Sequence, residues 1–418
     1  MLAWATNVVR VPELRRRLLF TAFALAAYRF GSWLPTPGVD PHAVTQFLQS
    51  NGSTIFGLLN LLSGSSLSRL SPFALGIVPY VTASIAMQLL TRAVPTFRQL
   101  QKEGEVGYTR ITQYTRYATV ALAATQATAY GYLFESQGAI HLDAGRFVVL
   151  VLTLTAGTTL LMWIGEQITK RGVGNGISIL IFASILVSAP TAIRAWLAGS
   201  PTERMLFPVT AMLILVSVVF VQDGQRKIPV QYARRMLGGR QGVSAASTYM
   251  PLRVNMAGVV PVIFAAALLA LPPTLAGFAP STTAFVNRYV QPGSFVYLAG
   301  EAALIIAFTF LYTSVQFDPA DQADTMRRYG GYIPGIRPGR PTEGYLGRVL
   351  RRLTLPGALF LAAVAITPCI FIRHAGFSQA TSRALGGTSV LIVVGVALDT
   401  MRQMESQMIA RRYEGFLK

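Results

Sequence analysis

The residues that could carry chemistry in this 418-residue chain are few, and their spacing does not assemble a reactive centre. The three histidines, His42, His141 and His374, lie far apart, and the single Cys369 cannot form an internal disulfide. No His, Cys or carboxylate spacing matches that of a metal site. The sequence therefore predicts that the protein is not an enzyme and needs no metal or cofactor.

Two further kinds of ligand chemistry are not favoured either. The glycine-rich stretch Gly172–Gly176 lacks the lysine of a phosphate-binding loop and does not follow a predicted strand. Ion-coupled transport would need ionisable residues inside apolar segments. The candidates Arg29, Glu301 and Asp399 all lie near the ends of such segments, where we expect their side chains to snorkel towards water.

Ten apolar segments would have to position whatever site the chain contains. Most approach the roughly 20 residues that a helix needs to cross a bilayer, and only 13% of the residues are charged. The composition therefore predicts an all-α polytopic membrane protein. The segments are Leu18–Leu34, Pro72–Leu90, Ala118–Phe134, Phe147–Gly165, Gly176–Ile193, Met205–Val221, Met256–Ala276, Phe295–Phe317, Leu353–Ile372 and Leu385–Leu398, the last being the shortest.

The basic residues alternate between the loops that join these segments. Of the 36 Lys and Arg residues, 28 lie in the two terminal stretches and in every second loop. Seven lie in the remaining loops, and Arg29 lies in the first segment. This distribution is the positive-inside bias, and it predicts an even number of spans with both termini in the cytoplasm.

Ten spans divide into two sets of five, with a boundary near Gly199–Pro201. Because five is odd, the second set would enter the membrane in the opposite orientation, as in transport proteins built from inverted repeats. We therefore predict an N-terminal half over residues 1–200 and a C-terminal half over residues 201–418.

Three segments between the spans have unusual patterns. Residues 53–71 contain an apolar run that is too short to span and is loosened by glycines, which predicts a re-entrant or interfacial piece. Residues 222–255 alternate apolar and polar side chains on both sides of a glycine cluster, which predicts a hairpin. Residues 318–352 begin with Asp318-Pro319, a helix-start signal, and continue into a basic, turn-rich stretch. The last two loops together predict a docking surface.

Several long motifs resemble the SecY family of protein-translocation channels. They are Phe73–Tyr80, Gly172–Ser178, Asn255–Pro261, Pro334–Gly339 and Gly386–Val393, and the resemblance runs from about Pro12 to Tyr413. It implies ten transmembrane helices in two inverted five-helix halves around a central pore, with a short re-entrant plug helix at about residues 53–70.

The resemblance also implies a pore closed by a ring of aliphatic side chains. Such a constriction can close by dewetting without gripping any particular substrate side chain. Without the resemblance, these residues would be interpreted as ordinary packing. The implied ring is Ile77, Val81, Ile177, Ile181, Ile263 and Ile392, with Val81 standing where many relatives carry isoleucine.

Two movable parts are implied next to the ring. The plug would comprise Ile55, Phe56, Gly57, Leu58, Leu59, Asn60, Leu61, Leu62, Ser63 and Gly64. The lateral gate, through which apolar segments would reach lipid, would be bordered by the polar residues Thr82, Gln88, Gln126 and Asn255. Polar contacts across a helix seam in a membrane contribute only about 0.6–2 kcal/mol each, so such a seam can part.

The implied docking residues for the SecA motor or the ribosome are Arg240, Arg337 and Arg340, while Gln241 replaces the second arginine of a family pair. Further implied partners are SecE, SecG, signal-bearing preproteins and lipids, and the basic loops would suit ribosomal RNA. The implied location is the bacterial inner membrane. The alternatives are a secondary solute transporter with inverted repeats, which a coupling carboxylate at mid-span would support, and a scaffold without a pore.

Overall fold

The computed structural model describes residues 12–50, 60, 63–136, 143–232, 248–269, 271–272, 294–375 and 387–416. Each of the ten predicted spans overlaps a helix. These helices are α2 (Pro12–Gly31), α5 (Val78–Ala93), α7 (Glu105–Ser136), α8 (Ala144–Arg171), α9 (Gly176–Ala198), α10 (Pro201–Asp223), α11 (Val260–Leu269), α14 (Phe295–Gln316), α16 (Arg340–Ala375) and α18 (Gly387–Phe416).

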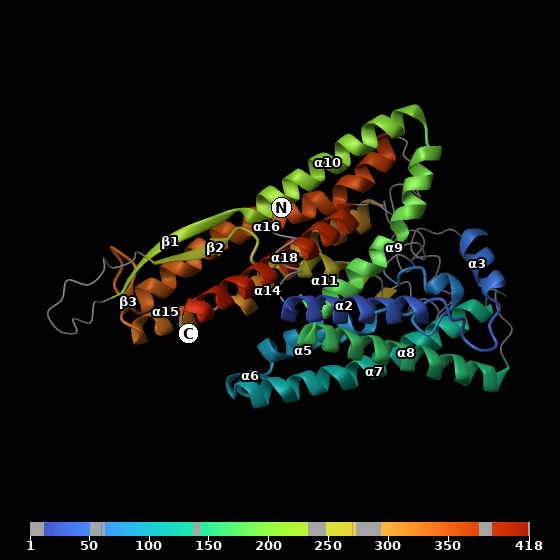
Figure 1. Cartoon of the computed structure of the whole chain (residues 1–418), viewed down its shortest axis with the longest axis horizontal. Coiled ribbons are helices and arrows are strands. Elements are labelled where there is room, and N and C mark those ends of the chain that lie inside the picture. Colours follow the sequence, from blue (N-terminus) through green and yellow to red (C-terminus); the bar gives the residue numbers. More distant parts are fainter. Residues whose placement is uncertain are drawn as a thin grey trace.

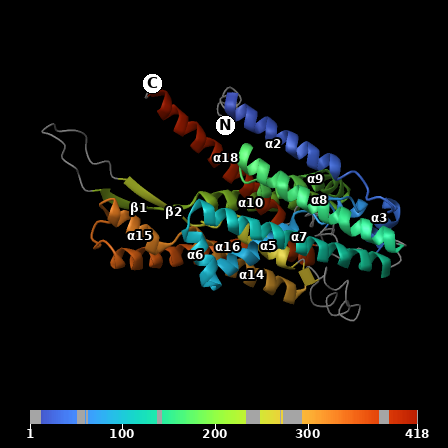
Figure 2. The ribbon, with the colours of Figure 1, turned by 90° about the horizontal axis from the view of Figure 1, so that it is seen from below.

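Short elements join the long helices. They are α3 (Pro41–Ser50), the 3-10 turn η1 (Leu67–Arg69), α6 (Pro95–Lys102), α15 (Pro319–Arg328) and the strands β1 (Gln225–Tyr232), β2 (Thr248–Arg253) and β3 (Gly331–Tyr332). In Figures 1 and 2, α6, α15, the strands and the C-terminal part of α18 lie towards one end of the molecule, and α3 lies at the other. We call the first the arginine-rich end, because it gathers the loops that are rich in Lys and Arg.

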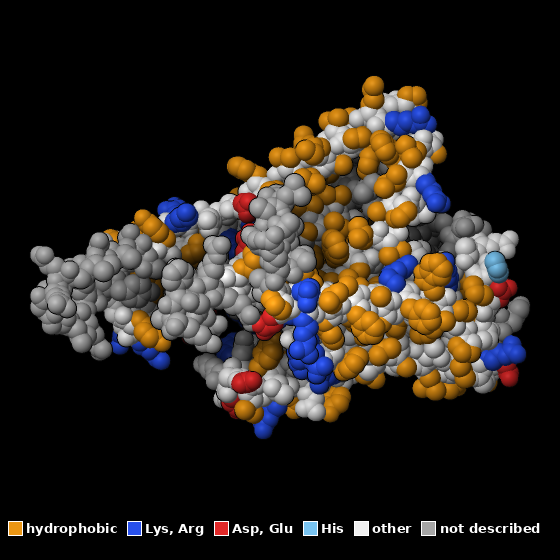
Figure 3. All heavy atoms as spheres, viewed as in Figure 1, with side chains coloured by type: hydrophobic (Ala, Val, Ile, Leu, Met, Phe, Trp, Pro, Cys, Tyr) orange, Lys and Arg blue, Asp and Glu red, His pale blue; other side chains and the backbone are white. Residues whose placement is uncertain are grey.

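The helices carry the surface expected of a protein in lipid. Among the described residues, five helical stretches are long and apolar enough to cross a membrane, namely Ala144–Arg171, Gly176–Ala198, Arg204–Asp223, Phe295–Arg328 and Arg340–Thr367. Large apolar side chains face outwards on α10, where Met205 is 81% and Phe220 is 79% exposed. Hydrophobic atoms likewise cover much of the helical surface in Figure 3. A water-soluble protein would not expose so continuous an apolar surface, so this is a multi-pass membrane protein.

Most predicted spans have different ends in the structure, and the second and tenth show two reasons. The second was predicted from Pro72, but α5 starts at Val78, because residues 72–77 form turns and Pro79 occupies the first turn of the helix. The tenth was predicted to end at Leu398, but α18 continues to Phe416. Hydropathy marks where a helix leaves apolar surroundings, whereas the helix itself continues as long as its backbone hydrogen bonds do.

The helices of residues 12–198 and those of residues 201–416 gather on two sides of the molecule in Figure 1. α9 and α10 meet at one tip, where the chain reverses between Ala198 and Pro201. One hydrophobic cluster crosses between the two sides. It takes buried residues from α2, α5, α8 and α9 on one side and from α10, α11, α14, α16 and α18 on the other.

At the arginine-rich end, the two predicted loops fold into a single unit. β1 pairs antiparallel with β2, which confirms the predicted hairpin, and Asp318 caps α15 by accepting a hydrogen bond from the backbone N–H of Ala320. β1 also pairs with β3 from the second loop, with Gln231 opposite Tyr332. Ile228, Leu252 and Leu346 are buried together beneath these elements. The sequence placed both loops on one side of the membrane but did not predict the pairing of β1 with β3 that joins them.

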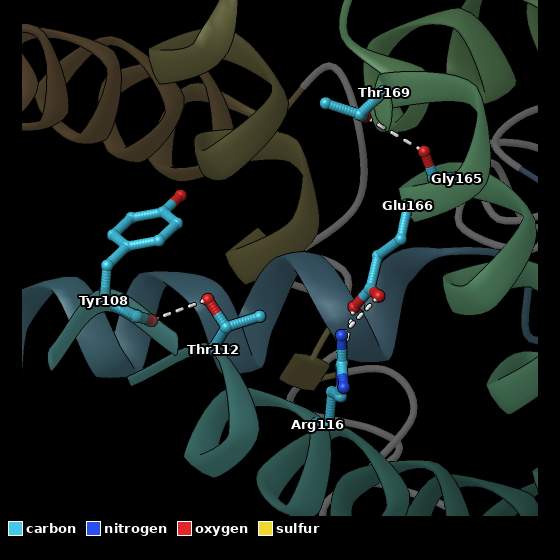
Figure 4. A network of polar contacts seen from close by, with 6 residues as sticks. All are labelled: Tyr108, Thr112, Arg116, Gly165, Glu166 and Thr169. Atoms are coloured by element: carbon cyan, nitrogen blue, oxygen red, sulfur yellow. Dashed lines mark hydrogen bonds and ion pairs between the residues drawn. The ribbon is translucent and has the colours of Figure 1, made fainter. Parts of the chain in front are cut away.

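A bidentate ion pair joins α7 to α8 (Figure 4). Arg116 Nε lies 2.8 Å from Glu166 Oε1, and Arg116 Nη2 lies 2.6 Å from Glu166 Oε2. The hydrogen bond to Glu166 raises the pKa of Arg116 above its usual value. The Glu166 side chain is only 13% exposed, so removing Arg116 would leave a poorly solvated carboxylate.

We expect Arg116→Met to lower the free energy of unfolding by about 1–2 kcal/mol, less than for a fully buried pair because Arg116 is partly solvated. Glu166→Gln should cost a similar amount, and the double variant should cost less than the sum of the two. Thermal unfolding of the reconstituted protein measures all three. Arg110→Met, at an exposed position of the same helix, is the control, and a strictly additive double variant would contradict the coupling.

Candidate functional site

The six predicted ring residues come from four helix starts that converge on the central cluster. Ile77 is the N-cap residue of α5, and Val81 lies one turn further on. Ile177 and Ile181 bear the same four-residue relation at the start of α9. Residues four apart share one face of a helix, so each of these helices presents two aliphatic side chains to the same neighbours.

The start of α9 is fixed by Asn175, whose side chain accepts hydrogen bonds from the backbone N–H groups of Ile177 and Ser178 at 3.1 and 3.4 Å. Gly174 just before it has φ +78°, a conformation that favours glycine. The glycine-rich stretch Gly172–Gly176, which we compared with a phosphate-binding loop above, therefore contains a helix cap that orients two predicted ring residues.

The structure brings all six ring residues into one hydrophobic cluster. Ile77, Val81, Ile181, Ile263 and Ile392 are buried members of it, between 1% and 7% exposed, and Ile177 packs against it partly buried. Gly395, one turn after Ile392, allows α18 to approach closely, since a Cβ there would lie 2.0 Å from a methyl group of Val259. The six predicted ring residues thus belong to one hydrophobic cluster that both sets of helices share.

The predicted plug is described at only three of its ten residues. Asn60, Ser63 and Gly64 are placed, whereas Ile55, Phe56, Gly57, Leu58, Leu59, Leu61 and Leu62 lie outside the described residues. The described end is anchored to two helices. The Tyr28 hydroxyl of α2 donates to the Ser63 carbonyl oxygen at 3.2 Å and lies 2.7 Å from Ser184 Oγ of α9.

A second bond reinforces this anchor, because Arg29 Nη1 donates to the Gly64 carbonyl oxygen at 3.0 Å. Gly64 has φ +63°, and a Cβ there would lie 2.9 Å from the Tyr28 hydroxyl and 3.1 Å from the Ser184 Cα. Glycine is therefore required both by the backbone conformation and by the close approach of α2 and α9. Sequence reasoning did not single out Tyr28 or Ser184, because neither side chain carries a pattern of its own.

We expect Tyr28→Phe to weaken the closed state of the plug, because the buried Ser63 carbonyl loses its partner. A net hydrogen bond contributes about 0.5–1.5 kcal/mol, which corresponds to a roughly 2- to 10-fold rise in resting ion leak. Halide leak from proteoliposomes measures it. Tyr130→Phe is the matched control, since Tyr130 is also buried but lies in a different cluster; an equal leak from both variants would contradict the anchor.

Of the predicted gate residues, Thr82, Gln126 and Asn255 are buried and Gln88 is half-buried. Thr82 and Gln88 lie on α5, Gln126 on α7 and Asn255 in the loop before α11, and α5 packs against both α7 and α11. Within the described part of the chain, no hydrogen bond links any two of these gate residues. Thr82 and Gln88 bond within α5, and Asn255 bonds to the nearby Gly258 carbonyl oxygen. One amide atom each of Gln88, Gln126 and Asn255 is buried without a protein partner. No direct polar contact between these residues therefore holds the seam together. Leaving buried polar atoms without partners also costs free energy in this arrangement.

The expectation that Glu301 snorkels is wrong. Glu301 is 6% exposed, and its Oε1 accepts a 3.4 Å hydrogen bond from the Thr388 hydroxyl of α18. It lies seven residues into α14, on a face that packs against other helices. Arg29 also bonds to the protein, because its side chain donates to the Gly64 carbonyl oxygen. The side chain of Asp399, in contrast, is 47% exposed, and its Oδ1 lies 3.9 Å from Arg402 Nη1.

Two of the three predicted docking arginines are described. Arg337 and Arg340 are exposed at the arginine-rich end, where the Thr342 hydroxyl donates to the Arg337 carbonyl oxygen at 2.9 Å. Ile333, four residues before Arg337, is buried in the cluster beneath the strands, so the turn that carries Arg337 is fixed to a folded base. Arg240 and Gln241 lie outside the described residues.

Fold and site together define a helical multi-pass membrane protein with a buried cluster of aliphatic side chains between its two sets of helices. Comparison with known proteins agrees. The SecY family model matches residues 71–401. The chain is 43% identical over 444 residues to protein translocase subunit SecY of Mycobacterium tuberculosis, and 44% identical over 445 residues to that of Streptomyces coelicolor, with 100% of every chain covered.

Solved structures show the same fold. A protein-conducting channel superposes with a TM-score of 0.63 at 18% identity, covering 95% of this chain and 93% of that one. Sec61 in the canine ribosome–channel complex from the endoplasmic reticulum gives 0.62 at 18% identity with the same coverage. The chain belongs to the SecY family. This membership makes it a protein-translocation subunit and does not favour the solute-transporter alternative.

Proposed function

We propose that this chain forms a passive channel through which unfolded preproteins cross the bacterial inner membrane and from which transmembrane segments leave sideways into lipid. The observation that carries the proposal is the convergence of six aliphatic residues from α5, α9, α11 and α18 on one buried cluster. A ring without charges or strong hydrogen-bonding groups binds no particular side chain, and it excludes water and ions when it is closed.

The moving parts follow from the same arrangement. Residues 1–200 and 201–418 act as two inverted halves that separate about the α9–α10 connection. The plug covers the ring and swings away from its anchor at Tyr28 and Arg29. The seam between α5 and α11 opens as the lateral gate, and the buried amide atoms Gln126 Nε2 and Asn255 Oδ1, which have no protein partner, support this role.

The arginine-rich end faces the cytoplasm, together with both termini, as the distribution of basic loops supports. There the unit built from β1, β2, β3 and α15 presents Arg337 and Arg340 to the SecA ATPase or to the ribosome, including its RNA. SecE and SecG bind from the lipid side. The chain itself performs no catalysis, and the energy for transport comes from these partners.

Protection of a signal-bearing precursor from protease tests the proposal. Proteoliposomes would contain this chain with SecE and a matching SecA, and protection would be measured with and without ATP. We expect protection that depends on both ATP and the chain. Absence of protection, while a known translocase succeeds in the same lipid, would contradict a protein-conducting channel.

A further inference from the structure

A cavity of about 260 Å³ lies next to the plug anchor and is lined by three arginines. Arg29 comes from α2, Arg69 from η1 and Arg194 from α9. Four hydroxyl side chains share the lining, those of Ser32, Ser65, Ser68 and Thr191, and none of the described residues around the cavity is a carboxylate. The lining of the cavity is thus polar and positively charged.

The positive-inside bias does not account for this concentration. The cavity lies away from the arginine-rich end, on the side where the sequence places only eight of the 36 basic residues, and three of these eight meet here. Among the described residues, no ion pair involves Arg29, Arg69 or Arg194. Arg29 instead bonds to the Gly64 carbonyl oxygen, and Arg69 lies over the Trp33 ring, 4.8 Å from its centroid. Three guanidinium groups around one cavity repel each other unless an anion lies between them.

We propose that this cavity binds a phosphate group, supplied by the headgroup of an anionic phospholipid. Guanidinium groups match phosphate oxygens in geometry and charge. The hydroxyls of Ser32, Ser68 and Thr191 already donate to backbone carbonyl oxygens, so the three arginines supply most of the donors for a phosphate. The cavity volume of about 260 Å³ is larger than that of several water molecules, each of which occupies about 30 Å³ in the liquid. It can therefore accommodate a phosphate group with the atoms next to it.

The surroundings of the cavity favour a lipid over a free ion. Trp33 lines it and is 63% exposed, and its neighbours Phe30 and Leu34 are 72% and 48% exposed. Exposed tryptophan side chains such as Trp33 mark the level of lipid headgroups, and Phe30 and Leu34 add apolar surface beside it. Acyl chains can therefore pack against these side chains while the phosphate reaches the arginines.

The position of the site links lipid binding to the plug. Gly64 and Ser65 line the cavity, and both lie within the predicted plug segment, residues 53–70. A phosphate held by Arg29, Arg69 and Arg194 would cross-link α2, η1 at the end of that segment, and α9. An occupied site therefore stabilises the anchored, closed arrangement.

Native mass spectrometry of the full chain, purified with its accompanying subunits and stripped of lipid, tests the binding directly. Phosphatidylglycerol, diacylglycerol with the same acyl chains, and inorganic phosphate serve as probes. Arg69→Gln with Arg194→Gln removes two charges from the cavity. Arg146→Gln with Arg204→Gln removes two exposed charges elsewhere on the same side and is the matched control.

We expect one phosphatidylglycerol site that diacylglycerol does not fill and that the control retains. The cavity variant should bind at least about tenfold more weakly, since a charge-assisted hydrogen bond is strong enough for a factor of that size. Equal binding of diacylglycerol, or equal losses in both double variants, would overturn the site. Displacement of the lipid by millimolar inorganic phosphate would overturn the lipid assignment in favour of the free ion. None of these readouts depends on protein translocation.

Discussion

Replacing Ile263 and Ile392 together by asparagine should raise the resting ion leak of the reconstituted channel by at least about tenfold. Both side chains are nearly fully buried, at 7% and 1% exposure, in the cluster that both sets of helices share. Removing an apolar side chain from a constriction lowers the free energy of wetting it by an amount on the order of 1–2 kcal/mol. A tenfold change in rate needs only about 1.4 kcal/mol, so the two substitutions together should exceed this factor.

The leak is measured as halide flux from proteoliposomes without precursor or motor. Ile305→Asn is the control, because Ile305 is fully buried in the same cluster but lies on α14, outside the ring. Thermal unfolding identifies any variant that fails to fold. A leak of equal size from folded Ile305→Asn would mean that loosened packing, rather than the ring, lets ions through.

The second large effect is expected for Arg337→Glu, which should reduce ATP-dependent precursor protection at least tenfold. Arg337 is exposed, and the hydrogen bond from Thr342 reaches only its backbone carbonyl oxygen. The turn that carries it is fixed by the buried Ile333, so reversing the charge should leave the fold intact. A motor that docks on this surface through acidic groups would then meet repulsion instead of attraction.

Arg328→Glu supplies the matched control, since Arg328 is an exposed arginine at the end of α15 in the same unit. Precursor protection and SecA binding should both fall for Arg337→Glu, while the resting halide leak stays unchanged. A similar loss for Arg328→Glu would show that overall charge, rather than Arg337 itself, determines docking. Full protection with Arg337→Glu would remove this turn from the proposed docking site.

Local sequence signals predicted much of the fold. Apolar segments near the length of a bilayer became helices, because whether a segment enters lipid depends mainly on its own composition. The alternation of Ile228 and Val230 predicted β1, and Asp318-Pro319 predicted the start of α15. Each of these signals lies within a few residues of the feature it predicts.

The candidate site could be predicted only in part. From its own pattern, Ile181 or Ile263 is one more apolar residue in an apolar helix, and it was the resemblance to a family that marked both as ring residues. The burial of Glu301 against Thr388 was not predicted, because a charge near the end of a span can equally well reach water. The outcome depends on which helix packs over it.

The sequence by itself determined that this chain is a helical membrane protein with a strong asymmetry in its basic loops. Only the tertiary structure decided that β3 joins the hairpin, that Tyr28 and Ser184 meet at Ser63, and that Arg29, Arg69 and Arg194 share one cavity. The physical reason is the separation along the chain over which each interaction acts. Hydropathy and capping act between neighbours in the chain, whereas these contacts join residues up to about 165 positions apart, and nothing in either partner's local sequence specifies the other.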